Sequence, residues 1–458
     1  MSQATDRFVS DNEARLLEEL MTFIRIPSVS TLPEHKPDIE RAARFVSAAL
    51  QRAGLENVEI IPTGGHPLVY GEWLHAPGKP TVLCYGHYDV QPADPLELWK
   101  SPPFEPSLVN GNIYARGAAD DKGQMYMHIK AVEALRVLDG KLPLNVKFLI
   151  EGEEEIGGPS IAKFVAEHRA KLKADVALVS DTALYAEGLP TLCVGLRGLA
   201  YLEVEAIGPS RDLHSGYYGG AAPNAVFGLI ELLAKCKNAD GVIQIPGFYD
   251  DVAEPAPQER SSWQQLPFSE QEFLEREVGA TSLTGEPGIP VLDRVWARPT
   301  FEVHGIAGGF TGAGQKTVIP SKATAKVSFR LVPNQDPARC LASFCKFAAE
   351  NAPKGIQINV RTLGASPAIS VNPDHPAIQI AARVFGEMLG RPTVFTRNGG
   401  SIPVVGDFAR HLGIPTILLG LGLPDDGLHS PNEKFNLQNF YTGIRTVARF
   451  FEEYGQQP

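Results

Sequence analysis

The chain has 458 residues, which is more than one hydrophobic core usually holds, so its length predicts two domains. Hydrophobic residues make up 43% and charged residues 21% of the chain, an ordinary globular composition that argues against overall disorder. Lys and Arg number 42 against 53 Asp and Glu, and the resulting net charge of −11 repels phosphate backbones and excludes nucleic acid as an expected partner.

The sequence also lacks the signals of membrane insertion and secretion. No apolar run approaches the roughly 18 residues that a spanning helix needs, so we expect no membrane partner. Residues 1–7 contain neither the basic nor the apolar region of a signal peptide. The five cysteines are odd in number and form no C-x-x-C pair, which is typical of reduced thiols. Together these features predict a cytoplasmic location.

Two kinds of hydrophobic pattern follow one another along the chain. Apolar residues at helical spacing predict a first helix over 11–24. Buried strands and helices then alternate, which is typical of a mainly parallel sheet covered by helices on both faces. The strands of this α/β fold are predicted at 81–85, 145–150, 175–179 and 416–421, and the helices at 124–138 and 160–172.

The middle of the chain has a different pattern. Residues 201–207 and 322–333 alternate strictly between apolar and polar side chains, as half-buried strands of a sheet with one open face do. Helical stretches at 224–238 and 337–350 lie among them, and 248–299 reads as an irregular excursion rich in Pro, Gln and Glu. We therefore predict a small α+β domain at 198–372, inserted into a larger domain formed by 1–197 and 373–458.

Acidic and imidazole side chains follow several of the buried strands, where parallel α/β sheets place their ligand sites. Taken singly, each has an ordinary explanation as a core histidine, a helix cap, a turn residue or a solvated charge. Together they indicate a metal site, because clustered like charges need a cation, and mixed His and carboxylate ligands suit zinc, manganese or cobalt. These side chains are His87, Glu153, Glu154, Glu155, Asp181 and His429, with Asp120 at the start of a helix.

The motifs around these residues resemble those of the dinuclear zinc aminoacylase/carboxypeptidase superfamily, in order and over nearly the whole chain. Within it, the chain is similar to the carnosinase-like cytosolic dipeptidases, which also share the excursion at 248–299. The superfamily motifs are Gly86-His87-Tyr88-Asp89-Val90, Arg116-Gly117-x-x-Asp120-Asp121-Lys122-Gly123, Glu151-Gly152-Glu153-Glu154-Glu155-x-Gly157, Ser180-Asp181-Thr182 and Leu428-His429-Ser430-Pro431-Asn432-Glu433. The dipeptidase motifs are Asp212-Leu213-His214-Ser215-Gly216, Thr317-Val318-Ile319-Pro320, Phe329-Arg330-Leu331-Val332-Pro333 and Gly399-Gly400-Ser401-Ile402-Pro403.

The resemblance implies two divalent ions per chain and assigns their ligands. One ion would be held by His87 and Asp181 and the other by Glu155 and His429, with Asp120 bridging both. Zinc is the first expectation, with manganese or cobalt as alternatives, because the same ligands accept all three.

The resemblance also assigns the residues that act beside the ions. Glu154 is expected to be the general base for the attacking water. Asp89 is expected to bond the second ring nitrogen of His87 and so fix its tautomer. A cis peptide bond is expected between Asp120 and Asp121. The neighbouring Glu153 receives no role.

Residues of the inserted domain complete the implied site. His214 resembles a histidine that stabilises the oxyanion from the partner subunit of a homodimer, with a capping or packing histidine as the ordinary alternative. Arg330 matches a residue that grips the substrate carboxylate, although by its position alone it is a charge on the polar face of a strand. Thr317, Gly400 and Ser401 match substrate-binding positions. The inserted domain is accordingly expected to be a ferredoxin-like lid and dimerisation domain.

The implied function is metal-dependent hydrolysis of the peptide bond of dipeptides, so the expected partners are a small peptide substrate and a second copy of the chain. Two alternatives stay open. One is an N-acyl amino acid deacylase, or an exopeptidase acting on longer peptides, within the same superfamily. The other is a metal-free binding protein that has kept the fold. The motifs lack none of the metal ligands or the base, which favours the enzyme.

Overall fold

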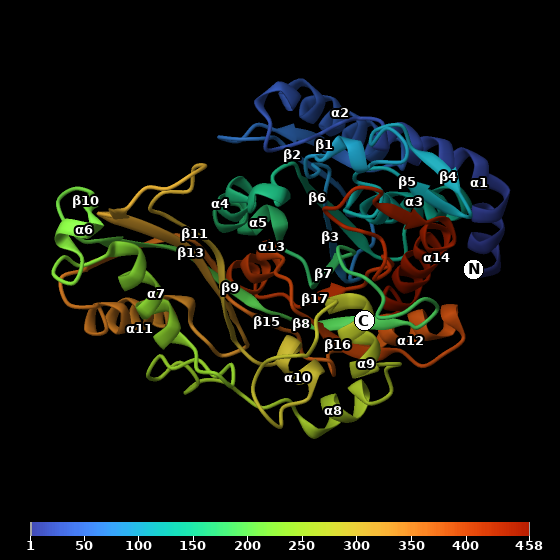
Figure 1. The fold of residues 1–458 in the computed structure, drawn as a ribbon. Coiled ribbons are helices and arrows are strands. Elements are labelled where there is room, and N and C mark those ends of the chain that lie inside the picture. The colour runs from blue at the N-terminus through green and yellow to red at the C-terminus, as the bar shows by residue number, and fades with distance from the viewer. Residues whose placement is uncertain (1, 458) are drawn as a thin grey trace. The chain divides into compact units, whose positions relative to one another are not determined.

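The computed structural model describes residues 2–457, and the chain divides into two compact units (Figure 1). Unit 1 comprises residues 1–194, 371–396 and 403–458, and unit 2 comprises residues 195–370 and 397–402. The chain first passes from unit 1 to unit 2 within strand β8 (Thr191–Leu196).

Unit 1 is built on a mixed sheet with a parallel centre, in the strand order β1-β2-β6-β3-β7-β17-β8. The neighbours β6, β3, β7 and β17 run parallel, and β1, β2 and β8 are antiparallel to the strands beside them. The central strands are almost wholly buried, because their apolar runs have no polar face. This confirms the predicted α/β fold. The strands are β1 (Glu56–Ile61), β2 (Leu68–Trp73), β3 (Thr81–His87), β6 (Asn145–Glu151), β7 (Val176–Val179) and β17 (Thr416–Leu418).

Two groups of helices and a small sheet complete unit 1 (Figure 1). The first group is α1 (Ser2–Ile24), α2 (Lys36–Arg52), α3 (Lys122–Asp139), α12 (Pro376–Leu389) and α14 (Leu437–Tyr454). The second group is α4 (Pro159–Glu167), α5 (Arg169–Leu172) and α13 (Pro403–Asp407). The small antiparallel sheet consists of β4 (Ser107–Val109), β5 (Asn112–Tyr114) and β18 (Lys434–Asn436), and β16 (Val394–Asn398) pairs with β8.

Two predicted helices differ in extent from the observed ones. The first begins at Ser2, nine residues before the predicted start at Asp11, because the polar N-terminal residues continue the helix beyond its apolar stripe. The helix predicted over 160–172 is divided at His168, whose Nδ1 lies 3.1 Å from the Phe164 carbonyl oxygen and whose ring stacks on Phe164.

Unit 2 has its own core beneath a four-stranded antiparallel sheet in the order β11-β13-β9-β14. Along β9 buried and half-buried residues alternate without exception, so the alternation in the sequence is the alternation of this sheet. Helices α7 and α11 pack on the buried face, and the other face carries ion pairs such as Glu203 with Lys326 and Arg361. The elements are β9 (Gly198–Ile207), α7 (Ala225–Cys236), β11 (Thr300–Gly308), β13 (Lys322–Leu331), α11 (Pro337–Glu350) and β14 (Gln357–Ser366).

The excursion at 248–299 is more ordered than its composition suggests. It forms short helices that pack through Trp263 against Trp296, with ring centroids 5.2 Å apart, and through an ion pair between Arg260 and Asp293. Its elements are α8 (Pro257–Trp263), α9 (Glu270–Glu272), a π-helical turn (Phe273–Val278) and α10 (Val291–Trp296). The remaining elements of unit 2 are β10 (Leu213–His214), α6 (Ser215–Tyr218), β12 (Val318–Ile319) and β15 (Ile369–Ser370).

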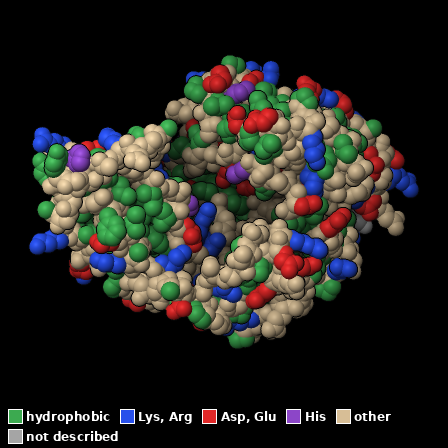
Figure 2. Space-filling model, in the orientation of Figure 1, with side chains coloured by type: hydrophobic (Ala, Val, Ile, Leu, Met, Phe, Trp, Pro, Cys, Tyr) green, Lys and Arg blue, Asp and Glu red, His purple; other side chains and the backbone are tan. Residues whose placement is uncertain are grey.

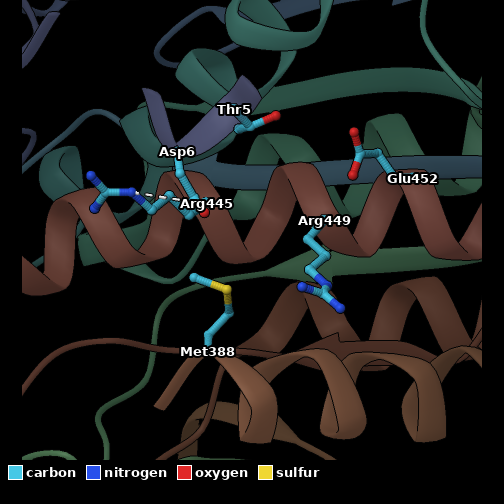
Figure 3. A pocket seen from close by; sticks show the side chains of 6 residues that line it. All are labelled: Thr5, Asp6, Met388, Arg445, Arg449 and Glu452. Carbon is cyan, nitrogen blue, oxygen red and sulfur yellow. Dashed lines mark ion pairs between the residues drawn. The ribbon is translucent and has the colours of Figure 1, made fainter. Parts of the chain in front are cut away.

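Two further features bear on where a substrate could bind. Within residues 2–457, no helix is both long enough and apolar enough to cross a membrane. A polar cavity beside α1 and α14 of unit 1 has a volume of about 10 Å³ (Figure 3), which is room for about one water molecule and not for a peptide. Its lining consists of Thr5, Asp6, Met388, Arg445, Arg449 and Glu452.

Candidate metal centre

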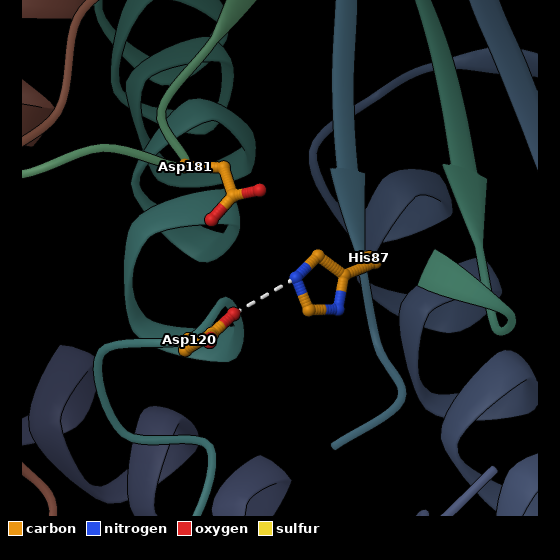
Figure 4. A group of neighbouring side chains, drawn as sticks. All are labelled: His87, Asp120 and Asp181. Atoms are coloured by element: carbon orange, nitrogen blue, oxygen red, sulfur yellow. Dashed lines mark hydrogen bonds and ion pairs between the residues drawn. The ribbon is translucent and has the colours of Figure 1, made fainter. Parts of the chain in front are cut away.

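The strand ends of unit 1 bring the first three predicted ligands together. His87 is the last residue of β3, and Asp181 follows the end of β7 by two residues. Because β3 and β7 are parallel neighbours, their carboxyl ends meet at one edge of the sheet. Asp120 reaches the same place from the turn before α3. One ligand-type atom of each of His87, Asp120 and Asp181 lies within 4.8 Å of the others (Figure 4).

A second group shares Asp120 with the first. Glu155 stands in a short 3-10 helix (Glu154–Ile156) after β6, and His429 stands in the loop between β17 and β18. With Asp120 they form another set of ligand-type atoms within 4.8 Å of one another. Asp120 Oδ1 lies 3.1 Å from His87 Nε2, and Asp120 Oδ2 lies 3.0 Å from His429 Nε2. The two oxygens of one carboxylate therefore face two different imidazoles.

The electrostatics of these groups follow from burial and crowding. Burial, and then the nearby Asp120 and Asp121 carboxylates, raise the pKa of Asp181 well above its ordinary value. The pKa of Asp120 is lowered instead, because its bonds to His429 and His87 outweigh its burial. Bonds to Asp120 and Glu155 raise the pKa of His429 to about 10.

This donor set fits divalent metal ions. Two imidazoles and three carboxylates are ligands that zinc, manganese and cobalt accept, and a shared carboxylate can bridge two ions. Among the residues that the structure describes, no Lys or Arg forms an ion pair with Asp120, Glu155 or Asp181. A cation at each group would offset this negative charge.

Asp89 contacts more partners than its predicted bond to His87. Its carboxylate Oδ1 lies 3.4 Å from His87 Nδ1, while its own carbonyl oxygen lies closer, at 3.1 Å. The same carboxylate accepts hydrogen bonds from the amides of Glu154 at 3.2 Å and Glu155 at 3.1 Å. Asp89 therefore holds both the histidine and the turn that carries the two glutamates.

Glu154, the predicted base, lies beside the two groups without belonging to either. Burial, with the charges of Glu155 and Asp120, raises the pKa of Glu154 to about 7, although His87 opposes the shift. A carboxylate of this pKa is matched to accepting and returning a proton near neutral pH. The peptide bond between Asp120 and Asp121 is cis, as the resemblance implies.

Glu153 has a structural role that the sequence did not reveal. Its side chain is buried, and Oε1 accepts a hydrogen bond from the His66 amide at 2.8 Å while Oε2 accepts one from the Ser160 amide at 3.1 Å. Ser160 lies in the first turn of α4, where amides lack helical partners. A glutamate one position before the base thus caps a helix and fixes the 64–66 loop.

The predicted residues of unit 2 form two local sets. His214 in β10 faces Val318 in β12, and the amide of Ser215 donates to the Thr317 carbonyl at 3.0 Å, so His214 and Thr317 are neighbours. His214 is exposed, and its Nδ1 accepts a hydrogen bond from the Gly216 amide at 3.0 Å, which leaves Nε2 as the outer nitrogen.

The second set lies at the end of β13. Arg330 donates from Nη1 to Ser401 Oγ at 3.1 Å, and the neighbouring Gly400 amide donates to Asn398 Oδ1 at 2.8 Å. These residues all belong to unit 2.

Arg197 belongs to this second set and was missed by the sequence reasoning. Its Nε donates to the Gly399 carbonyl at 3.2 Å, but its Nη1 is buried without a hydrogen-bond partner among residues 2–457. Burial and the charge of Arg330 lower the pKa of Arg197 to about 10. Neither guanidinium forms an ion pair with a carboxylate in the described part of the chain. The only sequence signal was an Arg-Gly step directly after β8, which by itself specifies nothing.

The chain is similar to known proteins in both sequence and structure. The profile described as peptidase family M20/M25/M40 matches residues 83–453. The Cys-Gly metallodipeptidase dug1 of Schizosaccharomyces pombe is 34% identical over 465 residues, covering 97% of this chain and 96% of that protein. The Beta-Ala-His dipeptidase of Homo sapiens is 30% identical over 469 residues, covering 98% of this chain and 92% of that protein.

The structural comparison extends over the same length. An M20 family metallo-carboxypeptidase from Sulfolobus solfataricus, Sso-CP2, matches with a TM-score of 0.87 at 30% identity, covering 96% of this chain and 99% of that one. Sequence and structure therefore agree over nearly the whole chain, as the order of the motifs predicts.

Proposed function

The chain belongs to peptidase family M20/M25/M40 and is a metallopeptidase, and we propose that it hydrolyses the peptide bond of dipeptides. The observation that carries this proposal is the pair of His and carboxylate groups that share Asp120 beside Glu154. The dipeptide is proposed as the substrate because two relatives that match over nearly the full chain carry dipeptidase names.

We assign the residues of unit 1 as follows. His87 and Asp181 would hold one divalent ion, Glu155 and His429 would hold a second, and Asp120 would bridge them, which the grouping of their ligand atoms supports. Such ions supply Lewis-acid polarisation of a carbonyl and a water of lowered pKa. Zinc is the first candidate, and manganese and cobalt are alternatives because they take the same ligands.

Glu154 is the proposed general base. It takes a proton from the water that attacks the peptide carbonyl and returns a proton to the leaving amine, so the carboxylate is regenerated in each cycle. Its pKa of about 7, raised by burial and by neighbouring carboxylates, supports this role. Asp89 positions Glu154 by accepting its amide hydrogen.

The residues of unit 2 are proposed to bind the substrate. Arg330 would bind the C-terminal carboxylate of the substrate. Its half-buried position supports this role, as does the neighbouring Arg197, since neither guanidinium has a carboxylate partner among residues 2–457. Ser401 orients Arg330 through their hydrogen bond. Thr317 and Gly400 are proposed as further substrate contacts, and His214 as an oxyanion donor through Nε2.

A broader carboxypeptidase activity is the second candidate. The observation that favours it is the likeness to the metallo-carboxypeptidase Sso-CP2 at 30% identity over nearly both chains. Both candidates need a free C-terminal carboxylate, and they differ in how many residues precede the scissile bond. N-acyl amino acid deacylase activity is the third candidate, and the same assay tests it with N-acetyl amino acids.

We further propose that the chain forms a homodimer through unit 2. Hydrophobic side chains gather on the surface near α7 (Figure 2), and Phe227 and Ile230 are exposed residues of this helix. Exposed apolar patches of this kind are typical of protein interfaces. Four cysteines, Cys84, Cys236, Cys340 and Cys345, are free thiols, which supports a reducing and hence cytoplasmic location. Sedimentation equilibrium of the full chain measures its molecular mass in solution. The mass of a monomer would contradict the proposed dimer.

The assay that tests the proposed function compares dipeptides, their C-terminal amides, tripeptides and N-acetyl amino acids, each with zinc, manganese or cobalt added. We expect dipeptides with a free carboxylate to be cut fastest. Charge-assisted hydrogen bonds are worth roughly 1.5–3 kcal/mol, so the amide should lose about ten- to a hundred-fold in kcat/KM.

The variant Arg330→Ala should narrow the difference in kcat/KM between the dipeptide and its C-terminal amide, because it lowers kcat/KM for the free acid alone. Arg361→Ala, which removes an exposed arginine from the same sheet, is the matched control and should leave the difference unchanged. Equal rates on acid and amide in the wild type would contradict the assignment of Arg330. Faster cleavage of tripeptides would favour the carboxypeptidase.

A further inference from the structure

One buried carboxylate beside the metal centre is not among the proposed ligands, yet it accepts four hydrogen bonds. Glu433 is fully buried and follows His429 by four residues, at the end of the loop before β18. Its Oε2 accepts from Arg116 Nη1 at 2.7 Å and from the Gly117 amide at 3.0 Å. Its Oε1 accepts from the Ala119 amide at 3.0 Å and from the Asp120 amide at 3.1 Å.

These donors belong to the turn that carries the bridging Asp120. The turn needs Gly117, which has a φ of +78° and where a Cβ would lie 2.4 Å from Val90 Cγ1. A turn of this shape points three amides inward, and the one carboxylate of Glu433 accepts from all three of them and from Arg116. An amide in this buried place has only one acceptor oxygen and would leave some of these donors unpaired, which is destabilising.

The same ion pair also holds the loop that carries His429. Arg116 is 1% exposed, and its Nη2 donates to the Ser430 carbonyl at 3.2 Å. His429 and Asn432 adopt left-handed φ values of 59° and 65°, which cost free energy in residues other than glycine and persist only where surrounding contacts hold them. The ring of His429 is 56% exposed and bonds only Asp120 and Glu155 within the described chain, so its backbone must fix its position.

We propose that Glu433 is a positioning residue that fixes Asp120 and His429 relative to one another and thereby sets the affinity of the Asp120–Glu155–His429 group for its ion. The proposal rests on the metal centre of the proposed function. The proposal predicts different effects on the two groups of ligands. His87 and Asp181 lie at the ends of β3 and β7 and depend on Glu433 only through Asp120, so their ion should be affected less.

The test measures metal binding and not only activity. Metal-free Glu433→Gln is titrated with zinc and with manganese, each against a chromophoric chelator, and its thermal unfolding without metal is recorded. Loss of a residue that orients metal ligands typically weakens metal binding 10–100-fold. We expect one ion to bind about 10–100-fold more weakly, the other to bind within a few-fold of wild type, and excess metal to restore kcat with KM for the dipeptide unchanged.

Two further variants keep the outcome decisive. Glu452→Gln changes another buried glutamate of unit 1, in α14, which forms no hydrogen bond or ion pair with the 116–120 turn among residues 2–457, and this variant should bind both ions as wild type does. If Glu433→Gln does not fold, Arg116→Lys retains the charge but loses the planar fork that reaches both Glu433 and Ser430. It should weaken the same ion to a smaller degree.

Wild-type affinity for both ions in a Glu433→Gln protein whose metal-free form is merely less stable would overturn the proposal, since Glu433 would then support the fold alone. Equal weakening of both ions would overturn its selectivity. A wild-type protein that binds no divalent ion would instead contradict the proposed function, so the two failures are distinguishable.

Discussion

Three consecutive glutamates, Glu153, Glu154 and Glu155, have different roles because their side chains have different neighbours. Glu153 caps α4, and Glu154 lies beside the candidate metal centre with a pKa of about 7. Glu155 belongs to the group with Asp120 and His429 that could hold a metal ion. Identical residues take different roles because the turn after β6 points each carboxylate in a different direction. Periodicity cannot resolve such a turn, and only the motif resemblance separated Glu154 from Glu155.

The variant Glu154→Gln tests that separation. It removes the proton acceptor while leaving all five proposed ligands in place, so metal content should be retained and kcat should fall by at least the 10²–10⁴-fold that general acid–base catalysis typically contributes. Glu153→Gln is the matched neighbour. It should lose stability through the α4 cap and keep most of its kcat per folded molecule. Turnover near the wild-type rate in Glu154→Gln would require a different base.

Other residues of the site could not be found from the sequence because their partners are distant. Glu433 bonds a turn more than 300 residues earlier, and Arg197 approaches the 399–401 loop about 200 residues later. Nothing local marks either contact. The five proposed metal ligands were predictable because each follows an apolar strand or opens a helix within a recognisable motif.

At the scale of elements, the parallel strands explain why distant ligands meet, and one buried histidine ties a helix to that strand edge. His128 lies within α3, and its Nε2 contacts Ser180 Oγ at 2.7 Å, while Ser180 Oγ donates to the Leu419 carbonyl at 2.6 Å. Three elements, α3, β7 and β17, therefore join through two side chains next to Asp181. The segments after β7 and β17 also pack closely at Gly420, where a Cβ would lie 1.9 Å from the Thr182 carbonyl oxygen.

His128 predicts how the fold responds to acid. Burial lowers its pKa from 6.5 to about 3, so the unfolded chain takes up the proton first as the pH falls below about 6.5. A group whose pKa is lower in the folded state stabilises the fold above that pH and loses its contribution on acidification, by about 1.4 kcal/mol per pH unit. Between pH 7 and pH 5 this amounts to about 2 kcal/mol.

His128→Gln keeps a donor towards Ser180 but does not titrate, so urea unfolding of the metal-free variant should show a smaller loss of stability from pH 7 to pH 5 than wild type. Working without metal removes the pH dependence of metal binding from the comparison. His75→Gln, at a position 59% exposed in its side chain, should retain the wild-type loss. An unchanged loss in His128→Gln would show that this histidine does not drive the acid response.

At the scale of the whole molecule, the sequence predicted the fold class because each unit has its own pattern. Long apolar runs mark the parallel strands of unit 1, and strict alternation marks the one-sided sheet of unit 2. The excursion at 248–299 could not be resolved, because its short helices depend on contacts such as Trp263 with Trp296 and not on an amphipathic stripe. Composition argued against nucleic acid as a partner but could not assign a substrate. The dipeptide was inferred from the resemblance of the motifs and from the names of the relatives.

We infer that five side chains of unit 1 hold two divalent ions and that peptide hydrolysis depends on these ions. This inference is tested by the metal content of the purified chain in elemental analysis, taken together with its hydrolysis of dipeptides before and after chelation. We predict close to two ions per chain, no hydrolysis after chelation, and recovery when zinc, manganese or cobalt is restored, with Asp120→Ala losing metal and activity together. Full activity in the metal-free protein would contradict the claim.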